Sequence, residues 1–439
     1  MTIRMDEGAA ELLDTLHRAG YAAYVVGGCV RDSLLGLTPH DWDLCTSALP
    51  QQVMELFGAQ RCIPTGLQHG TVTVKQSGAL YEITTFRTEG TYTDGRHPDE
   101  VHFVPDVRED LARRDLTINA MAYNEKEGLV DPFGGQADLQ SGIVRAVGVP
   151  RQRFTEDALR ILRLYRFAAR FGFAIDPPTA QAAQELCAHL DCVSVERIEE
   201  ELAKLLSAPA PAAYLDKKIL LVILPELSSE ALAAAKPVVD ACPAGAENLP
   251  IRLAALLYSL GEDGTRRTLR RLRCPNNRIE ETAVLVREAR GCDGSFLFGH
   301  DSGHSIARPL AFGNRVPPQR TVLRETTVTP GFIIYARRLL GKYNLCTVQR
   351  IAALGTALQP ERAADFAALS ELAEQLDADG VCCRVSQLAV NGRDLMAAGI
   401  PAGPGIRKVL EALLDGVIRE EYPNERQALL AAVQQFAAS

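Results

Sequence analysis

The sequence predicts an α/β (α+β) domain at the head of the chain, followed by an all-α remainder. Residues 1–147 alternate helix-like and strand-like patterns, whereas strand signals nearly vanish after Pro150. The later part consists of helical patterns interrupted by breaks such as DPP at 176–178 and APAP at 208–211. A chain of 439 residues is too long for one ordinary core, so several domains are expected.

The composition fits a globular protein, with 47% hydrophobic and 23% charged residues. A net charge of -8 argues against a protein that coats nucleic acid through overall positive charge. Arginines nevertheless cluster at 108–114, 145–170 and 266–273, which is compatible with a polyanionic partner. Eleven cysteines without a CxxC pair favour a reducing compartment. No apolar run reaches membrane-spanning length, so we expect a cytoplasmic protein without a membrane partner.

Short runs rich in β-branched or aromatic residues predict the strands of the head, and an amphipathic helix is predicted over residues 1–20. The runs are bounded by Gly, Pro or Asp, which are typical of turns. They are YAAYVVGG at 21–28, WDLCT at 42–46, GTVTVKQ at 70–76, YEITTF at 81–86 and GIVRAVG at 142–148.

Two acids separated by one residue accompany the second of these runs. Side chains alternate between the faces of a strand, so Asp41 and Asp43 are expected on one face and Trp42 on the other. Carboxylates that close repel each other unless a proton or cation intervenes, and oxygen ligands at this spacing suit Mg²⁺. Glu82 would add a third oxygen ligand if the strands pair. A solvated strand edge is the alternative explanation for the acid pair.

Gly27 and Gly28 end the preceding run, where backbone N–H groups without neighbouring side chains can approach phosphate oxygens. Arg31 lies in the helix that follows. A plain turn would explain the glycines alone, but their combination with the acids indicates a site for a triphosphate and a metal. The chain contains neither GxGxxG nor GxxxxGK[ST], which excludes the Rossmann fingerprint and the P-loop.

Longer motifs in the same part of the chain resemble those of the class II tRNA nucleotidyltransferases, which comprise the CCA-adding enzymes and their poly(A) polymerase relatives. The motifs are GGCVRD, DWDLCTSALP, PTGLQHGTVTV, YEITTFRTEGTYTDGRHPDEVHFV and LARRDLTINAMAYN. The resemblance covers residues 21–206 and continues more weakly to the C-terminus. It implies a nucleotidyltransferase head with a mixed β-sheet at 1–147, a helical neck at 148–207, a helical body at 208–310 and a helical tail at 311–439.

The resemblance also implies an activity: the tRNA 3′-hydroxyl attacks the α-phosphate of CTP or ATP, and pyrophosphate leaves. C, C and A are then added without a nucleic-acid template. The expected partners are CTP, ATP and tRNA, contacted at its acceptor stem and elbow, and no DNA partner is expected. Carried over to this sequence, the catalytic residues are Asp41, Asp43 and Glu82, the Mg²⁺ ligands are Asp41 and Asp43, and the triphosphate-binding residues are Gly27, Gly28 and Arg31.

The segment FTEDALRILRLYRFAARFGF at 154–173 carries a predicted means of choosing the base. On a helical wheel the apolar stripe comprises Ala158, Ile161, Leu162, Tyr165, Ala168 and Ala169, and the opposite side comprises Glu156, Arg160, Arg163 and Arg166. Acid-arginine pairs that stabilise an exposed helix would be the simpler explanation.

Cytosine and adenine both present an amine donor beside a ring-nitrogen acceptor, and uracil and guanine reverse that pattern. A carboxylate at Asp157 and a guanidinium at Arg160 would therefore accept C and A and reject U and G. In the resembled family the EDxxR motif has this role, so it is carried over to Glu156, Asp157 and Arg160. Arg163 and Arg166 are expected either to contact the triphosphate or to stabilise the neck.

The RRD motif resembles the family motif that contacts the nucleotide sugar. Arg113, Arg114 and Asp115 are therefore expected to bind ribose, and Asn119 is a further candidate for a sugar or phosphate contact. A helix cap by Asp115 is the alternative. Residues 87–99 resemble the flexible loop of the family.

In the predicted tail, Arg393, Arg407 and Lys408 would meet tRNA phosphates, although solvated helix faces also explain these charges. Some relatives carry a His/Asp phosphohydrolase domain, but no histidine lies between His189 and His300, so that activity is not expected. The alternatives left open are a poly(A) polymerase, a partial enzyme that adds only CC or only A, and a non-catalytic RNA-binding protein on the same fold.

Overall fold

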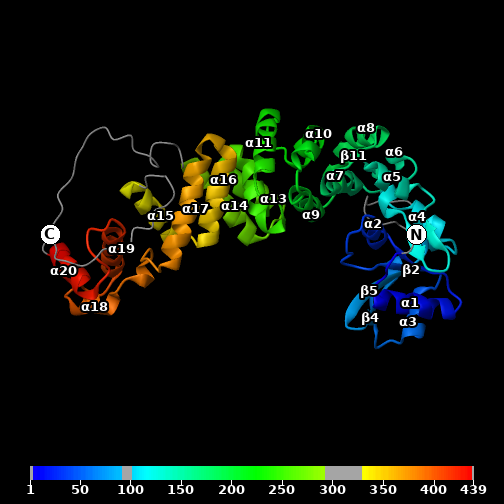
Figure 1. Ribbon diagram of the computed structural model, residues 1–439, viewed down its shortest axis with the longest axis horizontal. Helices are drawn as coiled ribbons and strands as arrows, with labels where there is room; N and C mark the ends of the chain where they lie inside the picture. Colours follow the sequence, from blue (N-terminus) through cyan, green and yellow to red (C-terminus); the bar gives the residue numbers. More distant parts are fainter. Residues whose placement is uncertain (1–2, 91–100, 292–328, 438–439) are drawn as a thin grey trace. The chain divides into compact units, whose positions relative to one another are not determined.

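The computed structural model describes residues 3–90, 101–291 and 329–437, and Figure 1 gives the element labels used below. The chain divides into two compact units. The N-terminal unit comprises Met1–Asp240, Ala244–Leu249 and Thr268–Cys274; the C-terminal unit comprises Ala241–Pro243, Pro250–Arg267 and Pro275–Ser439. The predicted boundaries at 147/148, 207/208 and 310/311 stay predictions, and the last of them falls outside the described residues.

A seven-stranded sheet forms the centre of the head, in the order β3-β4-β5-β2-β1-β8-β9. Its members are β1 (Ala23–Val26), β2 (Leu44–Thr46), β3 (Cys62–Gly66), β4 (Thr71–Gln76), β5 (Ala79–Thr85), β8 (Ala122–Asn124) and β9 (Gly128–Val130). β2 runs parallel to β5, whereas the other neighbours pair antiparallel. The predicted mixed sheet is therefore confirmed.

Two further pairs of strands lie outside this sheet. β6 (Arg87–Glu89) pairs antiparallel with β7 (Val101–Phe103). β10 (Ile143–Val144) pairs in parallel with β11 (Ala174–Ile175), so the strand expected at 142–148 is shorter than predicted and does not join the head sheet.

Helices pack against the strands: α1 (Glu7–Arg18) contacts β1 and β2, α3 (Pro50–Phe57) contacts β4 and β5, and α4 (Val107–Ala112) contacts β6. A hydrophobic cluster joins Tyr24, Val26 and Cys45 of the sheet to Val107 and Leu111 of α4. This core holds the strand ends that carry the candidate site. The helices of the head are α1 (Glu7–Arg18), α2 (Gly28–Leu34), α3 (Pro50–Phe57), α4 (Val107–Ala112) and α5 (Gly135–Ser141), with 3-10 turns at Leu67–His69 and Thr117–Asn119.

The segment after the head is helical, but it is not one helix through the EDxxR motif. α6 (Pro150–Glu156) ends at Asp157, whose backbone is extended with φ -144° and ψ 105°, and α7 (Leu159–Phe171) begins after it. The six residues of the predicted apolar stripe are all buried, which confirms that part of the wheel. The next helices are α8 (Pro177–Leu186), α9 (Val195–Leu206), α10 (Lys217–Ile223) and α11 (Ser229–Ala241).

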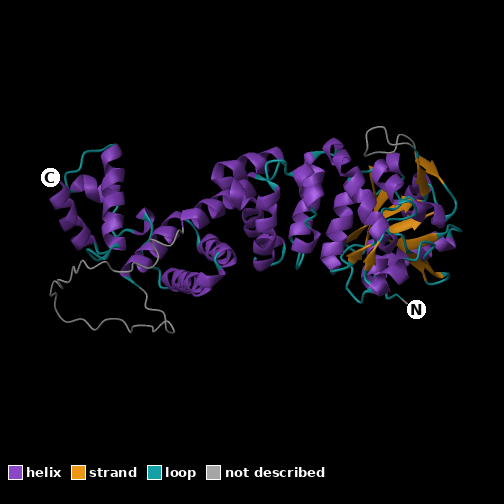
Figure 2. Cartoon of the chain, turned by 90° about the horizontal axis from the view of Figure 1, so that it is seen from above, coloured by secondary structure: helices purple, strands orange, loops and turns teal. Residues whose placement is uncertain are grey.

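The described part of the C-terminal unit contains helices and no strands, whereas Figure 2 shows the strands gathered in the head. α16 (Leu345–Leu358) packs against α14 (Asn276–Gly291) and α17 (Ala363–Ala378). A separate cluster around Leu395, Leu413 and Leu429 joins the last three helices. Among the described helices, none has the length and apolarity needed to cross a membrane. The bounds are α12 (Leu249–Leu257), α13 (Gly261–Arg271), α14 (Asn276–Gly291), α15 (Pro330–Lys342), α16 (Leu345–Leu358), α17 (Ala363–Ala378), α18 (Gly392–Ala397), α19 (Pro404–Ile418) and α20 (Arg426–Ala437).

Candidate active site

The paired acids lie at the start of β2 rather than within it. β2 begins at Leu44, so the strand expected at 42–46 is shorter than predicted. The pairing with β1 still reaches Asp43, because the Val26 N–H donates to the Asp43 carbonyl at 2.9 Å. Asp41 and Asp43 are both exposed, next to a strand end that the sheet holds in place.

Glu82 lies beside Asp43 because β2 and β5 are parallel neighbours. Leu44 pairs with Ile83, so the preceding position in the same register brings Glu82 next to Asp43. Burial alternates along β5, where Tyr81 and Ile83 are buried and Glu82 is exposed. The strand pairing on which the third carboxylate depended is therefore present. We refer to Asp41, Asp43 and Glu82 as the carboxylate edge.

The electrostatics of the carboxylate edge favour a cation. Partial shielding from water raises the pKa of Asp43, and the neighbouring Glu82 and Asp41 raise it further, whereas Arg114 opposes them. Within residues 3–90, 101–291 and 329–437, no group of three or more His, Cys, Asp or Glu side chains is assembled closely enough to hold a metal ion. Asp41 and Asp43 would thus provide part of a coordination shell, which suits Mg²⁺ because this ion usually keeps waters and binds substrate phosphates.

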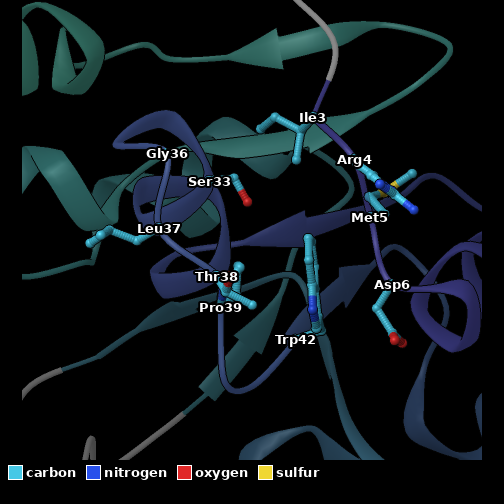
Figure 3. Close-up of a pocket in the computed structure, with 10 residues that line it drawn as sticks. All are labelled: Ile3, Arg4, Met5, Asp6, Ser33, Gly36, Leu37, Thr38, Pro39 and Trp42. Carbon is cyan, nitrogen blue, oxygen red and sulfur yellow. The ribbon is translucent and has the colours of Figure 1, made fainter.

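Trp42 occupies a different environment from the two acids that flank it. Its indole lines a cavity of about 530 Å³ between the N-terminal segment and the loop that follows α2. Figure 3 shows this side chain among the others that line the cavity. The cavity is lined by Ile3, Arg4, Met5, Asp6, Ser33, Gly36, Leu37, Thr38, Pro39 and Trp42. The expected alternation of Trp42 with the two acids stays a prediction, because these residues precede β2.

Gly27 forms a turn that only glycine adopts easily. Its φ is 78°, and a Cβ built on it would lie 2.8 Å from Nη1 of Arg114. The Gly27 N–H donates to the Met121 carbonyl at 3.0 Å, which ties the turn to the segment before β8. Gly28 then begins α2. The turn that follows β1 therefore contacts Arg114, one of the predicted ribose-binding residues, and the segment before β8.

Arg31 is buried, with 4% of its surface exposed. Its Nε donates to Oδ1 of Asp32 at 2.8 Å, and Nη1 donates to Oδ1 of Asn119. The guanidinium also lies 4.9 Å and 5.2 Å from the ring centroids of Phe167 and Phe171 on α7. Burial lowers the pKa of Arg31, against the opposing effect of Asp32. Arg31, predicted to bind the triphosphate, thus connects the head to α7.

Asp115 lies at the centre of the same contacts. Its Oδ2 accepts from Nε of Arg163 at 2.7 Å, and its Oδ1 accepts from Nδ2 of Asn119 at 3.2 Å. Burial alone would raise the pKa of this carboxyl, but Arg163, Asn119 and Arg160 together hold it well below its usual range. Asp115 does not cap the 3-10 turn at Thr117–Asn119, which starts after Leu116 without a side-chain cap.

Glu201 of α9 extends these contacts. Its Oε2 forms an ion pair with Nε of Arg166 at 2.7 Å, and its Oε1 lies 3.9 Å from Nη1 of Arg163. The Arg166 guanidinium is also 4.0 Å from the ring centroid of Phe167, and burial lowers its pKa to about 10. Predicted triphosphate and ribose residues are therefore joined in one set of contacts, which we call the neck network: Arg31, Asp115, Asn119, Arg163, Arg166 and Glu201.

The EDxxR residues each have defined partners. Oδ1 of Asp157 accepts from the Leu159 N–H at 3.0 Å, and its Oδ2 accepts from Nη2 of Arg197 at 2.8 Å. Arg160, with 8% of its surface exposed, donates to Oε2 of Glu156 at 2.7 Å and to the Arg113 carbonyl at 3.2 Å. The base-reading motif is thus attached both to α9 and to the ribose motif.

Sequence reasoning did not identify Arg197, Glu201 or Arg153 as partners of the site. The sequence contains one signal for the first two, since SVERIEEELAKLL at 194–206 resembles the family's neck. The structure adds that Glu201 is buried, with 4% exposure, on a helix whose other acids are mostly accessible.

The predicted tRNA-contacting residues lie elsewhere, in the C-terminal unit. Arg393 is exposed near the start of α18. Arg407 and Lys408 are exposed on α19, where Nε of Arg407 donates to Oε1 of Glu411 at 2.8 Å. This i,i+4 pair is the arrangement expected of a solvated helix face. His97 and most of the loop predicted at 87–99 lie outside the described residues.

Family models match most of the described chain. A model described as "Poly A polymerase head domain" matches residues 23–145, and one of tRNA nucleotidyltransferase domain 2 matches 335–433. A third, described as "Probable RNA and SrmB-binding site of polymerase A", matches residues 172–230.

Relatives are similar to the chain over nearly its whole length. The CCA-adding enzyme of Levilactobacillus brevis is 34% identical over 431 residues, which is 97% of both chains. The crystal structure of the Bacillus stearothermophilus CCA-adding enzyme in complex with CTP is 30% identical with a TM-score of 0.74, covering 99% of this chain and 98% of that one. A Thermotoga maritima CCA-adding enzyme complexed with tRNA shares the fold at 21% identity and a TM-score of 0.65 over 99% and 97% of the chains. The chain therefore belongs to the family of CCA-adding tRNA nucleotidyltransferases.

Proposed function

We propose that this tRNA nucleotidyltransferase adds C, C and A to the tRNA 3′ end from CTP and ATP, releasing pyrophosphate, with Mg²⁺ at the carboxylate edge. The observation that carries the site assignment is the register that brings Glu82 next to Asp43, close to the Gly27 turn. Arg114 lies against this turn and its charge acts on Asp43, which gives the site a cation that can face a triphosphate.

In the proposed reaction Asp41 and Asp43 hold Mg²⁺, which would stabilise the charge that develops on the transferring phosphate. Glu82 adds a third carboxylate to this edge. The Gly27 turn has no side chain, which lets the Arg114 guanidinium lie against the backbone at this edge, where it would face the triphosphate. Arg114, Arg113 and Asp115 hold the sugar, and within the neck network Arg163 of α7 fixes Asp115.

Base choice is assigned to Asp157 and Arg160. A C or A base would donate its amine to Asp157 and accept at its ring nitrogen from Arg160, whereas U or G would leave charged groups unpaired. Arg197 and Glu156 support this proposal because each fixes one of the two reading groups. The tail residues Arg393, Arg407 and Lys408 would contact tRNA phosphates, and a cytoplasmic location fits a tRNA substrate.

The test is an incubation of the pure protein with Mg²⁺ and tRNA that ends before CCA, supplied with CTP, ATP or both, followed by sequencing of the 3′ ends. Growth by CCA followed by arrest is expected. Growth by CC alone, by one A or by a long A tail would replace the proposal with one of the related activities. No growth at all would instead favour an RNA-binding protein without catalysis.

A further inference from the structure

The end of α4 is held by two arginines from the helices of the neck. Nη1 of Arg153 donates to the Ala112 carbonyl at 3.0 Å, and Nη2 of Arg160 donates to the next carbonyl, that of Arg113, at 3.2 Å. Glu156 lies between the two guanidiniums, because Oε1 accepts from Arg153 at 2.6 Å and Oε2 accepts from Arg160 at 2.7 Å. We call Arg153, Glu156 and Arg160 the α4 clamp.

The chemistry of a helix end explains why these contacts form. The last carbonyls of a helix have no intrahelical partners and carry partial negative charge, so guanidinium donors are favourable there. Hydrogen bonds between ionised groups are about twice as strong as neutral ones. Arg153 and Glu156 are largely shielded, with 11% and 20% of their side chains exposed, so solvent screens their pair less than an open surface pair.

The position of the clamp in the chain matters more than its strength. Arg113–Asp115, the proposed ribose-contacting residues, directly follow the clamped carbonyl of Ala112. Arg160, the proposed base-contacting guanidinium, is itself one arm of the clamp. A movement of α6 that releases Arg153 would therefore remove one of the contacts that hold the sugar-contacting turn and, at the same time, one of the two arginine partners of Glu156, which orients Arg160.

We propose that Arg153 is a positioning residue that holds the ribose-contacting turn and the base-contacting Arg160 in one fixed arrangement, so that selection of sugar and selection of base depend on the same contact. This inference rests on the proposed function. It assigns Arg153 a role that the neighbouring arginine on the same helix does not share, since Arg151 pairs with Glu185 and both side chains are accessible.

The experiment compares the wild type, Arg153→Met, Arg153→Lys and the matched control Arg151→Met. For each, kcat and KM are measured with tRNA ending before CCA and with CTP, dCTP or UTP. Arg153→Met should reduce the preference for CTP over dCTP and over UTP together, each by about tenfold, the loss expected for a charge-assisted contact. Arg153→Lys should reduce both preferences by less, because an ammonium lacks the planar fork that reaches two acceptors.

Thermal unfolding of each variant separates a local effect from global damage. If Arg153→Met does not fold, the parallel decrease in Arg153→Lys decides the question. The inference is overturned if both preferences stay at the wild-type value, if only one of them falls, or if Arg151→Met changes them equally. Failure of the wild type to extend tRNA with CTP would overturn the proposed function itself, and the wild-type and Arg151→Met reactions report that separately.

Discussion

Two charged regions of the N-terminal unit differ in how their charges are compensated. In the carboxylate edge, Asp43 is crowded by Glu82 and Asp41 and its pKa is raised. In the neck network, Asp115 is bonded to Arg163 and Asn119 and its pKa is lowered. The first region is electrostatically strained until a cation arrives, whereas the second is already satisfied. Substitutions in the two regions should therefore separate loss of chemistry from loss of stability.

The largest expected effect follows from removing a carboxylate of the edge. Asp43→Ala should lower the rate of nucleotide addition by about a thousandfold, the scale seen when a group that stabilises transition-state charge is removed. The temperature of thermal unfolding should not fall, because the substitution also removes repulsion with Glu82. The exposed Glu55→Ala on α3 is the control for loss of one acid from the head. Addition near the wild-type rate would contradict the metal assignment.

The opposite pattern is expected in the neck network. Asp115→Asn should lower the free energy of unfolding by about 3 kcal/mol, since it removes the buried charge that pairs with Arg163 at 2.7 Å. Activity should fall with it. The measurement is chemical denaturation of this variant beside Asp14→Asn, whose exposed partner is Arg18. Equal stability of the two variants would mean that the network contributes nothing to folding.

The same carboxylate gives a pH dependence of defined sign. The folded pKa of Asp115 lies below the unfolded value of about 3.9, so its stabilisation is present above that pH. It is lost as the pH falls through the lower, folded-state pKa. The unfolding free energy of the wild type should decrease on acidification below about pH 4, and Asp115→Asn should lack this part of the decrease. Parallel curves for the two proteins would contradict the ion pair.

Base selection should respond less than total activity. Replacing both Asp157 and Arg160 with Ala should raise the efficiency of UTP and GTP relative to CTP and ATP by about a hundredfold, because the charged groups that penalise a wrong base are gone. Competition assays with pairs of nucleotides measure this ratio, and Arg151→Met serves as the control. An unchanged ratio would remove the argument that the protein replaces a template.

The smallest effect is expected in the C-terminal unit, where the charges are exposed. Arg407→Ala combined with Lys408→Ala should raise the KM for tRNA about threefold and reduce its salt dependence, without changing thermal stability. Glu411→Ala is the matched variant, since it frees Arg407 and should not raise the KM. A loss of stability in the double variant would show that these side chains support the helix instead.

The sequence predicted the mixed-sheet head and the helical remainder. It also predicted that Glu82 would join the two aspartates if their strands pair. It did not predict β8 and β9, because three-residue strands are defined by long-range partners rather than by local alternation. The strand predicted at 142–148 is longer than the observed β10, whose partner is the distant β11 at Ala174–Ile175. The site residues were identified through the motifs that resemble the family, and the roles assigned to them stay predictions.

The partners of those motif residues were less accessible. Arg197 and Glu201 meet the site through ion pairs, and Arg153 through a hydrogen bond to the Ala112 carbonyl. Each contact joins elements far apart in the chain and leaves no periodic signal in the sequence. Burial of Arg31 was also not expected, because an arginine after two glycines resembles an exposed phosphate ligand. Only the packing of α7 against the head, with Phe167 and Phe171 beside this guanidinium, makes it visible.

The most direct measurement tests base choice and transfer together. The wild-type protein is incubated with Mg²⁺, tRNA ending before CCA and all four nucleoside triphosphates at equal concentration, and the products are sequenced. If Asp157 and Arg160 choose the base and the carboxylate edge performs the transfer, the 3′ ends will read CCA and stop there. Frequent U or G at the first three added positions would contradict the account, as would a continuing tail of A.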